Sequence, residues 1–256
     1  MRYFDTHCHL DFEVFDSSLE SLLVACRSSG IDRFVIPGTR VSSIPKIRSI
    51  QKQNEGVYVA FGIHPFFVDD DSLSDLPELE RNLISAECDP SLVAVGEIGL
   101  DRFCDADYEL QCRVFEAQLA LALKLGLPVI LHNRKSDQRI LDALTRYPVK
   151  GGVVHGFSGS YETAMRFIDR GFKIGIGGVV TWENARKVRD MVVRLPLDAI
   201  VLETDAPDMS PQWAKGQVNS PSELPAIARY LSELKKIDLA MLCEQLYRNS
   251  CELFFD

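Results

Sequence analysis

Apolar, β-branched runs of strand length alternate with longer segments of helical periodicity from one end of the chain to the other. Eight such runs predict eight strands. They span Tyr3–Leu10, Phe34–Gly38, Val57–Pro65, Leu92–Asp101, Leu127–His132, Gly152–Phe157, Phe172–Gly178 and Ala199–Asp205. The segments between them predict helices. The clearest is Glu109–Leu125, which is rich in Ala and Leu and is followed by Gly126 and Pro128.

This alternation predicts the α/β class and, within it, a (β/α)8 TIM barrel. Near-continuous apolar strands spaced by helices indicate a parallel sheet that is covered on both faces. Eight β/α units in 256 residues match the size of such a barrel. An open doubly wound sheet is the alternative, but no Gly-x-Gly-x-x-Gly motif follows the first strand. Because no linker or repeat divides the chain, residues 1–256 are expected to form a single domain.

Composition narrows the classes of function. The net charge is −9, which argues against high-affinity, non-specific binding of duplex DNA, although a local cluster of cations can still attract nucleic acid. Seven cysteines without a Cys-x-x-Cys pair indicate free thiols in a reducing compartment. No apolar run is long enough to span a membrane, and the N-terminus lacks the apolar core of a signal peptide. The sequence therefore predicts a cytoplasmic protein with no membrane contact.

Polar residues cluster where the predicted strands end, and all five histidines of the chain are among them. In a (β/α)8 barrel the carboxyl ends of the strands meet at one mouth, where active sites lie. His7 and His9 are expected on one face of the first strand, because side chains alternate along a strand. Four of these five imidazoles, together with two carboxylates, are enough to hold two divalent metals, so the mouth predicts a binuclear metal site that Glu97 bridges. The residues that converge are His7, His9, His64, Glu97, His132, His155 and Asp205.

Other polar residues are interpreted from their position beside this cluster. Glu203 shares the inward face of Asp205, where an unpaired carboxylate would be costly, so it is expected to lie behind the ligands and to orient one histidine. His64 and Arg134 are expected to bind the anionic oxygens of the substrate. Asp101 is interpreted as the partner of Arg134 in a loop ion pair.

Motifs that contain these residues resemble those of the TatD-type metal-dependent hydrolases of the amidohydrolase-like barrel superfamily, and in particular its YjjV-like branch. The resemblance covers essentially the whole chain. It implies that His7, His9, Glu97, His132, His155 and Asp205 are metal ligands, and that the activity is phosphodiester hydrolysis, classically as a deoxyribonuclease. The motifs are Asp5-Thr6-His7-Cys8-His9-Leu10, Gly62-Ile63-His64-Pro65, Gly96-Glu97-Ile98-Gly99-Leu100-Asp101, Leu131-His132, His155-Gly156-Phe157-Ser158-Gly159-Ser160 and Glu203-Thr204-Asp205-Ala206-Pro207.

The chain departs from the family pattern at two places. The family's Arg-Asn-Glu-Pro stretch after the eighth strand is Val218-Asn219-Ser220-Pro221 here, which keeps Asn219 as a candidate substrate contact but lacks the arginine. Phe66 stands where the third-strand motif often carries a second histidine. Both changes remove groups that could hold phosphate, so the hydrolase assignment is stronger than the deoxyribonuclease assignment.

Three functions are distinguished on these grounds. The leading hypothesis is a phosphoesterase that acts on DNA ends or single strands, in which Asp205 and Glu97 are catalytic and Asp205 orients a water molecule and accepts its proton. The alternative is hydrolysis of an ester, amide or aminoacyl bond in the same pocket. A non-catalytic barrel would be expected only if ligands were missing, and all six are present. The expected cofactors are two divalent ions, zinc, manganese or magnesium. No obligate protein partner is inferred.

Overall fold

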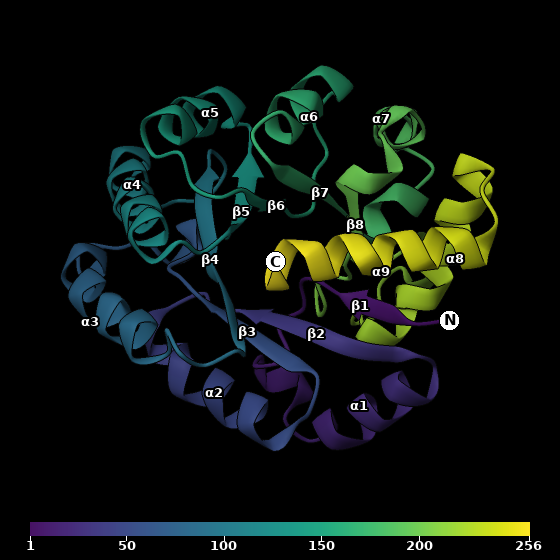
Figure 1. Cartoon of the computed structure of the whole chain (residues 1–256), viewed down its shortest axis with the longest axis horizontal. Helices are drawn as coiled ribbons and strands as arrows, with labels where there is room; N and C mark the ends of the chain where they lie inside the picture. Colours follow the sequence, from purple (N-terminus) through teal and green to yellow (C-terminus); the bar gives the residue numbers. More distant parts are fainter.

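The structure, a computed structural model that describes residues 1–256, is a barrel of eight parallel strands (Figure 1). The strands pair in chain order from β1 to β8. The barrel closes between its first and last strands, where the Thr6 N–H donates to the Leu202 carbonyl at 3.0 Å. The strands are β1 (Tyr3–Asp5), β2 (Ile31–Pro37), β3 (Val57–Phe61), β4 (Leu92–Asp101), β5 (Val129–Arg134), β6 (Gly152–Val154), β7 (Phe172–Ile176) and β8 (Ile200–Leu202). The predicted (β/α)8 TIM barrel is therefore confirmed.

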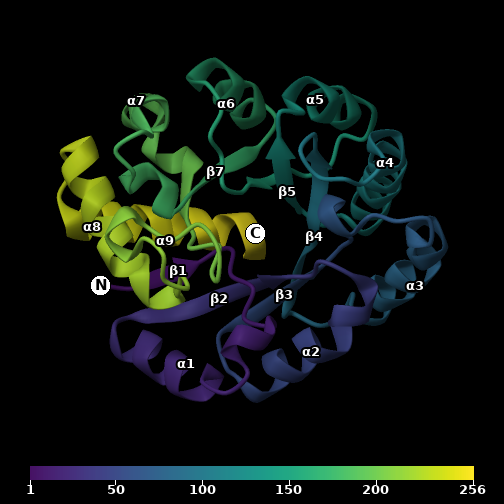
Figure 2. The same cartoon turned by 180° about the vertical axis from the view of Figure 1, so that it is seen from behind.

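Helices surround the strands on the outside of the barrel (Figures 1 and 2). The larger cluster of buried apolar residues fills the space between the sheet and these helices. The predicted helix 109–125 corresponds to α4, whose N-terminus is capped by Asp107 and which ends at Gly126 with a φ of 66°. The helices are α1 (Leu19–Ser28), α2 (Ile44–Gln53), α3 (Ser72–Ser85), α4 (Tyr108–Leu125), α5 (Asp137–Arg146), α6 (Tyr161–Ile168), α7 (Arg186–Arg194), α8 (Leu224–Lys235) and α9 (Leu239–Phe255).

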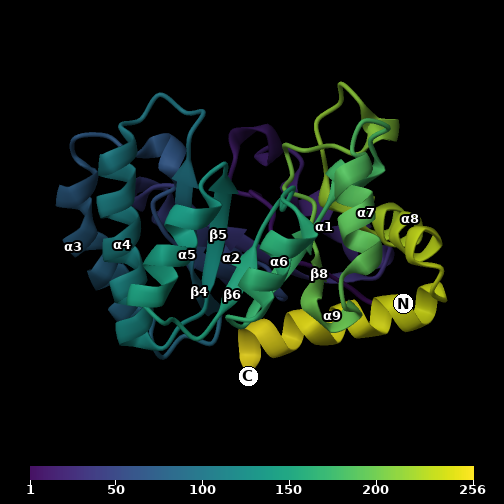
Figure 3. The ribbon, with the colours of Figure 1, turned by 90° about the horizontal axis from the view of Figure 1, so that it is seen from above.

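A second, smaller apolar cluster fills the barrel interior and closes one end of it. Inward-facing residues of the strands, such as Phe4, Val35 and Ile130, pack with Phe254 from α9. Helix α9 lies across the amino-terminal ends of the strands (Figure 3). This end is packed with side chains, and active sites of such barrels lie at the opposite mouth, where the carboxyl ends of the strands meet.

Several strands are shorter than the apolar runs suggested, and this corrects the expected position of two histidines. Strand β1 ends at Asp5, so His7 and His9 lie on the segment after the strand and not on a strand face. The chain nevertheless stays beside its neighbour, because the Asp205 N–H donates to the His7 carbonyl at 2.9 Å. Hydrogen bonds between the two segments beyond β1 and β8 thus hold both histidines at the mouth.

No helix of the structure combines the length and the apolar character needed to cross a membrane. All seven cysteines are present as free thiols.

Candidate functional site

A cavity of about 500 Å³ opens at the carboxyl ends of the strands. Its floor is formed by polar side chains that are far apart in the sequence and almost completely buried in the fold. The structure brings together all seven residues expected at the mouth: six line the cavity, and His7 lies fully buried beneath them. The six are His9, His64, Glu97, His132, His155 and Asp205.

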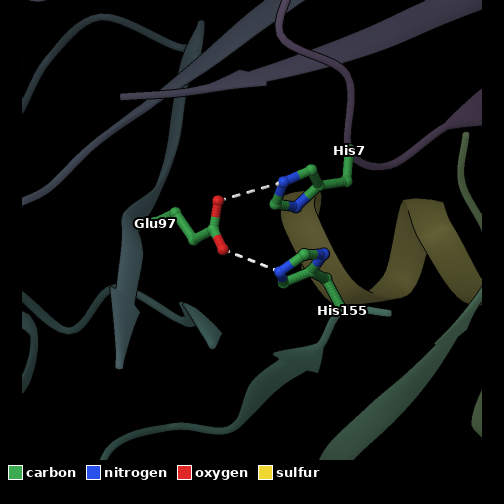
Figure 4. A group of neighbouring side chains, drawn as sticks. All are labelled: His7, Glu97 and His155. Atoms are coloured by element: carbon green, nitrogen blue, oxygen red, sulfur yellow. Dashed lines mark ion pairs between the residues drawn. The ribbon is translucent and has the colours of Figure 1, made fainter. Parts of the chain in front are cut away.

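Glu97 lies at the centre of this group and faces a different set of histidines with each carboxylate oxygen. Its Oε2 lies 3.2 Å from Nε2 of His7, and its Oε1 lies 2.7 Å from Nε2 of His155 (Figure 4). The side chain projects inward from β4, between residues that follow β1 and β6. One carboxylate therefore joins two groups of potential ligand atoms.

The first group contains four ligand atoms from His7, His9, Glu97 and Asp205. Ligands arranged tetrahedrally at about 2.0–2.1 Å from a zinc ion lie roughly 3.3–3.4 Å from one another. Here Nε2 of His7 is 3.2 Å from Nε2 of His9 and 3.4 Å from Oδ1 of Asp205. Nε2 of His9 is 3.6 Å from Oε2 of Glu97 and also 3.6 Å from Oδ1 of Asp205. These distances are close to those of a tetrahedral site, and the ligand atoms of His7, His9 and Asp205 all lie within 4.8 Å of one another, as ligands of one divalent cation do.

The second group contains three ligand atoms from His132, His155 and Glu97. Nδ1 of His132 lies 3.0 Å from Oε1 of Glu97 and 3.2 Å from Nε2 of His155. A cation held by these three residues would keep a coordination position for water or substrate, as catalytic sites do and structural sites do not.

The conformation of Asp205 is set by the turn that follows β8. Its φ of 58° lies in the left-handed region, which Asp tolerates better than most residues. The turn is held by Asn219, whose side-chain amide donates to the carbonyls of Thr204 and Asp208, both at 2.7 Å. The expected substrate contact of Asn219 is therefore wrong: its amide group is buried, bonded to the main chain and absent from the cavity lining.

Asp101 has a role beyond the loop ion pair expected for it. Its Oδ2 lies 2.8 Å from Nε2 of His132 and 3.8 Å from Nε of Arg134. Because a carboxylate only accepts hydrogen bonds, Nε2 of His132 carries a proton, and in the neutral ring the Nδ1 lone pair faces Glu97 and His155. This contact could have been predicted from the sequence, because Asp101 and Glu97 are an even number of residues apart on β4 and so belong to the same face of the strand.

The Asp101→Asn variant is expected to lose roughly 10- to 100-fold in cation affinity, because such outer partners orient metal-ligating imidazoles. An asparagine can turn its NH₂ group toward Nε2 and so favour the tautomer that protonates Nδ1. Calorimetric titration with Zn²⁺ and Mn²⁺ measures the change. Asp142→Asn, on the exposed face of α5, is the control. Unchanged affinity in Asp101→Asn with an unchanged melting temperature would contradict this role.

His64 belongs to the cluster geometrically but differs from the other histidines in its hydrogen bonds. Its Nδ1 accepts from the Phe66 N–H at 3.0 Å, so in the neutral ring the proton is on Nε2. That nitrogen lies 3.2 Å from Oε1 of Glu97. A protonated Nε2 donates a hydrogen bond and has no lone pair for a cation, which favours contact with a substrate or with Glu97.

The charge states of the cluster follow from burial and from Glu97. Burial lowers the pKa of His9 to about 4 and raises the pKa of Asp205 to about 7. Burial alone would lower the pKa of His155, but the adjacent Glu97 raises it to about 10. Burial would raise the pKa of Glu97, but His155 and the other imidazoles hold it well below its usual range. Without a cation the cluster therefore holds protons that a bound cation would displace.

Glu203 lies behind the cluster, as expected, but acts on the main chain. Its Oε1 accepts from the Gly156 N–H at 2.5 Å, and Gly156 directly follows His155. The other oxygen packs against Gly175, where an added Cβ would collide with it. Burial raises the pKa of Glu203 to about 7. No hydrogen bond joins Glu203 to the His155 ring in this structure, so Glu203 positions that histidine through the turn after β6.

Comparison with known proteins gives consistent results. The model of the family described as "TatD related DNase" matches residues 4–255. The chain is 38% identical over 256 residues to a protein of Escherichia coli K12 named "Uncharacterized metal-dependent hydrolase YjjV", covering 99% of this chain and 98% of that protein. It is 35% identical over 263 residues to an "Uncharacterized metal-dependent hydrolase" of Haemophilus influenzae, covering 99% and 100%. The crystal structure of the E. coli TatD homologue YjjV superimposes with a TM-score of 0.94 at 36% identity, covering 99% and 98% of the two chains.

Proposed function

Since this chain belongs to the TatD-related DNase family and is a metal-dependent hydrolase, we propose that it cleaves phosphodiester bonds, with DNA as its substrate class. The observation that carries this proposal is the placement of Glu97 between two groups of ligand atoms at the floor of an open cavity. Two cations held side by side suit displacement at phosphorus, because the attacking and leaving oxygens both require charge stabilisation.

The proposed ligands are His7, His9 and Asp205 for one cation, and His132 and His155 for the other, with Glu97 shared. When bound, such cations would lower the pKa of a water molecule and polarise the phosphoryl oxygens. Imidazole and carboxylate donors without thiolates admit zinc, manganese or magnesium. All of these ligands come from one chain, so the proposal requires no second subunit. We also propose a cytoplasmic location, because seven free thiols suit a reducing compartment.

Three side chains have proposed roles toward the substrate. Asp205 lines the cavity and presents a carboxylate beside His7 and His9, so it can orient a water molecule and accept its proton. The Nε2–H of His64 is placed to donate to a phosphoryl oxygen. Arg134, with its side chain half exposed at the cavity wall, presents a guanidinium to a second oxygen.

Chelator-stripped protein is expected to be inactive on single-stranded DNA and on bis(p-nitrophenyl) phosphate, and one divalent metal should restore activity on both, because the proposed chemistry relies on a cation to lower the pKa of water and to polarise the phosphoryl oxygens. Release of nucleotides and of p-nitrophenol measures the rates. His132→Ala should not be restored by that metal. Activity that survives chelation, or that is equal in His132→Ala, would refute the proposed centre.

Hydrolysis of another ester or amide bond is the second candidate, and the charge of the cavity favours it. Apart from the proposed metal ligands Glu97 and Asp205, the lining contains one carboxylate, that of Asp208, and one permanently charged cation, that of Arg134. A polynucleotide requires several cations for its phosphates. If metal restores hydrolysis of p-nitrophenyl acetate but not of either phosphodiester, the second candidate replaces the first.

A further inference from the structure

Phe66 presents a phenyl ring to the cavity although it stands beside the most polar part of the molecule. Its side chain lines the cavity, and the residue is 48% exposed. Its ring centroid lies 5.1 Å from that of His64 and 5.8 Å from that of His132, both in edge-to-face geometry. The main chain is fixed as well, since the Phe66 N–H donates to His64. The ring is thus held by the imidazoles on one side and free on the other.

A second exposed phenyl ring, that of Phe103, stands on the neighbouring loop after β4. Phe103 is 62% exposed, and its ring lies 5.0 Å from the guanidinium carbon of Arg134. The two loops touch, because Sγ of Cys104 lies 3.7 Å from the Pro65 carbonyl. The Phe103 N–H donates to Oδ1 of Asp101 at 2.6 Å, which ties this loop to the carboxylate that orients His132.

Phe66 and Arg134 therefore flank the same histidine. The phenyl ring contacts His132 directly, and the guanidinium contacts it through Asp101. A substrate group bound at His132 would have a flat apolar surface on one side and a single cation on the other. Half-exposed aromatic rings are stacking surfaces for flat rings, and a guanidinium pairs with an anionic group in a planar, bidentate manner.

We propose that Phe66, Phe103 and Arg134 form a subsite that binds a flat, unsaturated ring attached to the reacting anionic group. This proposal rests on the proposed function and names the part of the substrate next to the scissile bond. The ring chemistry is shared by a nucleobase and by the aryl group of a small ester.

Calorimetric titration of the metal-loaded protein with paired ligands tests the proposal. One pair is phenylphosphonate and cyclohexylphosphonate, which share a six-carbon ring that is unsaturated and flat only in the first. The other is thymidine 5′-monophosphate and 2-deoxyribose 5-phosphate, which differ by the base. The member with the flat ring is expected to bind about tenfold more tightly, as stacking on an aromatic side chain typically provides.

The variants separate stacking from apolar volume. Phe66→Leu keeps an apolar side chain but removes the flat face, so the preference should fall to about onefold to twofold. Phe255→Leu is the matched control, because Phe255 is 40% exposed at the opposite end of the barrel. A wild-type protein without preference in either pair, or a preference retained in Phe66→Leu, would overturn the subsite.

The outcomes also separate this proposal from the proposed function. Preference in the thymidine pair alone identifies a nucleobase, preference in the phosphonate pair alone identifies an aryl group, and both results support the subsite. Ring preference in a protein that cleaves no phosphodiester keeps the subsite and refutes the phosphodiesterase. Cleavage of phosphodiesters without ring preference keeps the phosphodiesterase and refutes the subsite.

Discussion

The Glu97→Gln variant is expected to lose at least about a thousandfold in hydrolytic rate and to retain at most one tightly bound cation, because one carboxylate serves both groups of ligands. Glutamine has almost the same shape, but its amide presents an oxygen to only one group and an NH₂ to the other. In the structure, the oxygens of Glu97 lie 3.2 Å from His7 and 2.7 Å from His155.

Elemental analysis after dialysis, combined with steady-state rates, measures both effects for Glu97→Gln. The matched control is Glu116→Gln on α4, whose carboxylate pairs with Arg146 on the outer surface. The control should keep the metal content and the rate of the wild type. Two bound cations and a rate near wild type in Glu97→Gln would show that the carboxylate does not bridge.

The Asp205→Asn variant is expected to retain cations but to lose roughly 10²- to 10⁴-fold in kcat, the contribution of a positioned general base. The asparagine oxygen can still act as a ligand beside His7 and His9, whereas the amide cannot accept a proton from water. Oδ1 of Asp205 lies 3.4 Å from Nε2 of His7 and 3.6 Å from Nε2 of His9, which places it among the potential ligand atoms. Asp205 also lines the cavity, where a water molecule can reach it.

Metal content and kcat must be measured on the same preparation of Asp205→Asn. A kcat near wild type with both cations in place would refute the role of Asp205 as proton acceptor. Loss of the cations together with the rate would assign Asp205 to metal binding alone. Glu97→Gln provides the comparison, because there the two quantities are expected to fall together.

The architecture and the identity of the converging residues were predictable from the order of residues along the chain. Leu92–Asp101, predicted from its apolar run, is strand β4 with the same bounds. Residues as distant as His7 and His155 could be grouped from the hydrophobic pattern, because parallel strands of a barrel end at one mouth whatever the lengths of the connections. That rule depends only on topology, so the order and spacing of the apolar runs were sufficient.

The contacts of the individual side chains could not be predicted in this way. Asn219 follows the same strand as Asp205, but its side-chain amide donates to two main-chain carbonyls. Asp101 contacts the His132 ring in addition to the expected Arg134. The division of the two Glu97 oxygens between His7 and His155 is equally invisible in the sequence. Such contacts depend on rotamers and on turns beyond the strand ends, where the two-residue alternation of a strand no longer applies. Hydrophobic periodicity therefore specifies which residues meet, and the packing of the connecting turns specifies which of their atoms face one another.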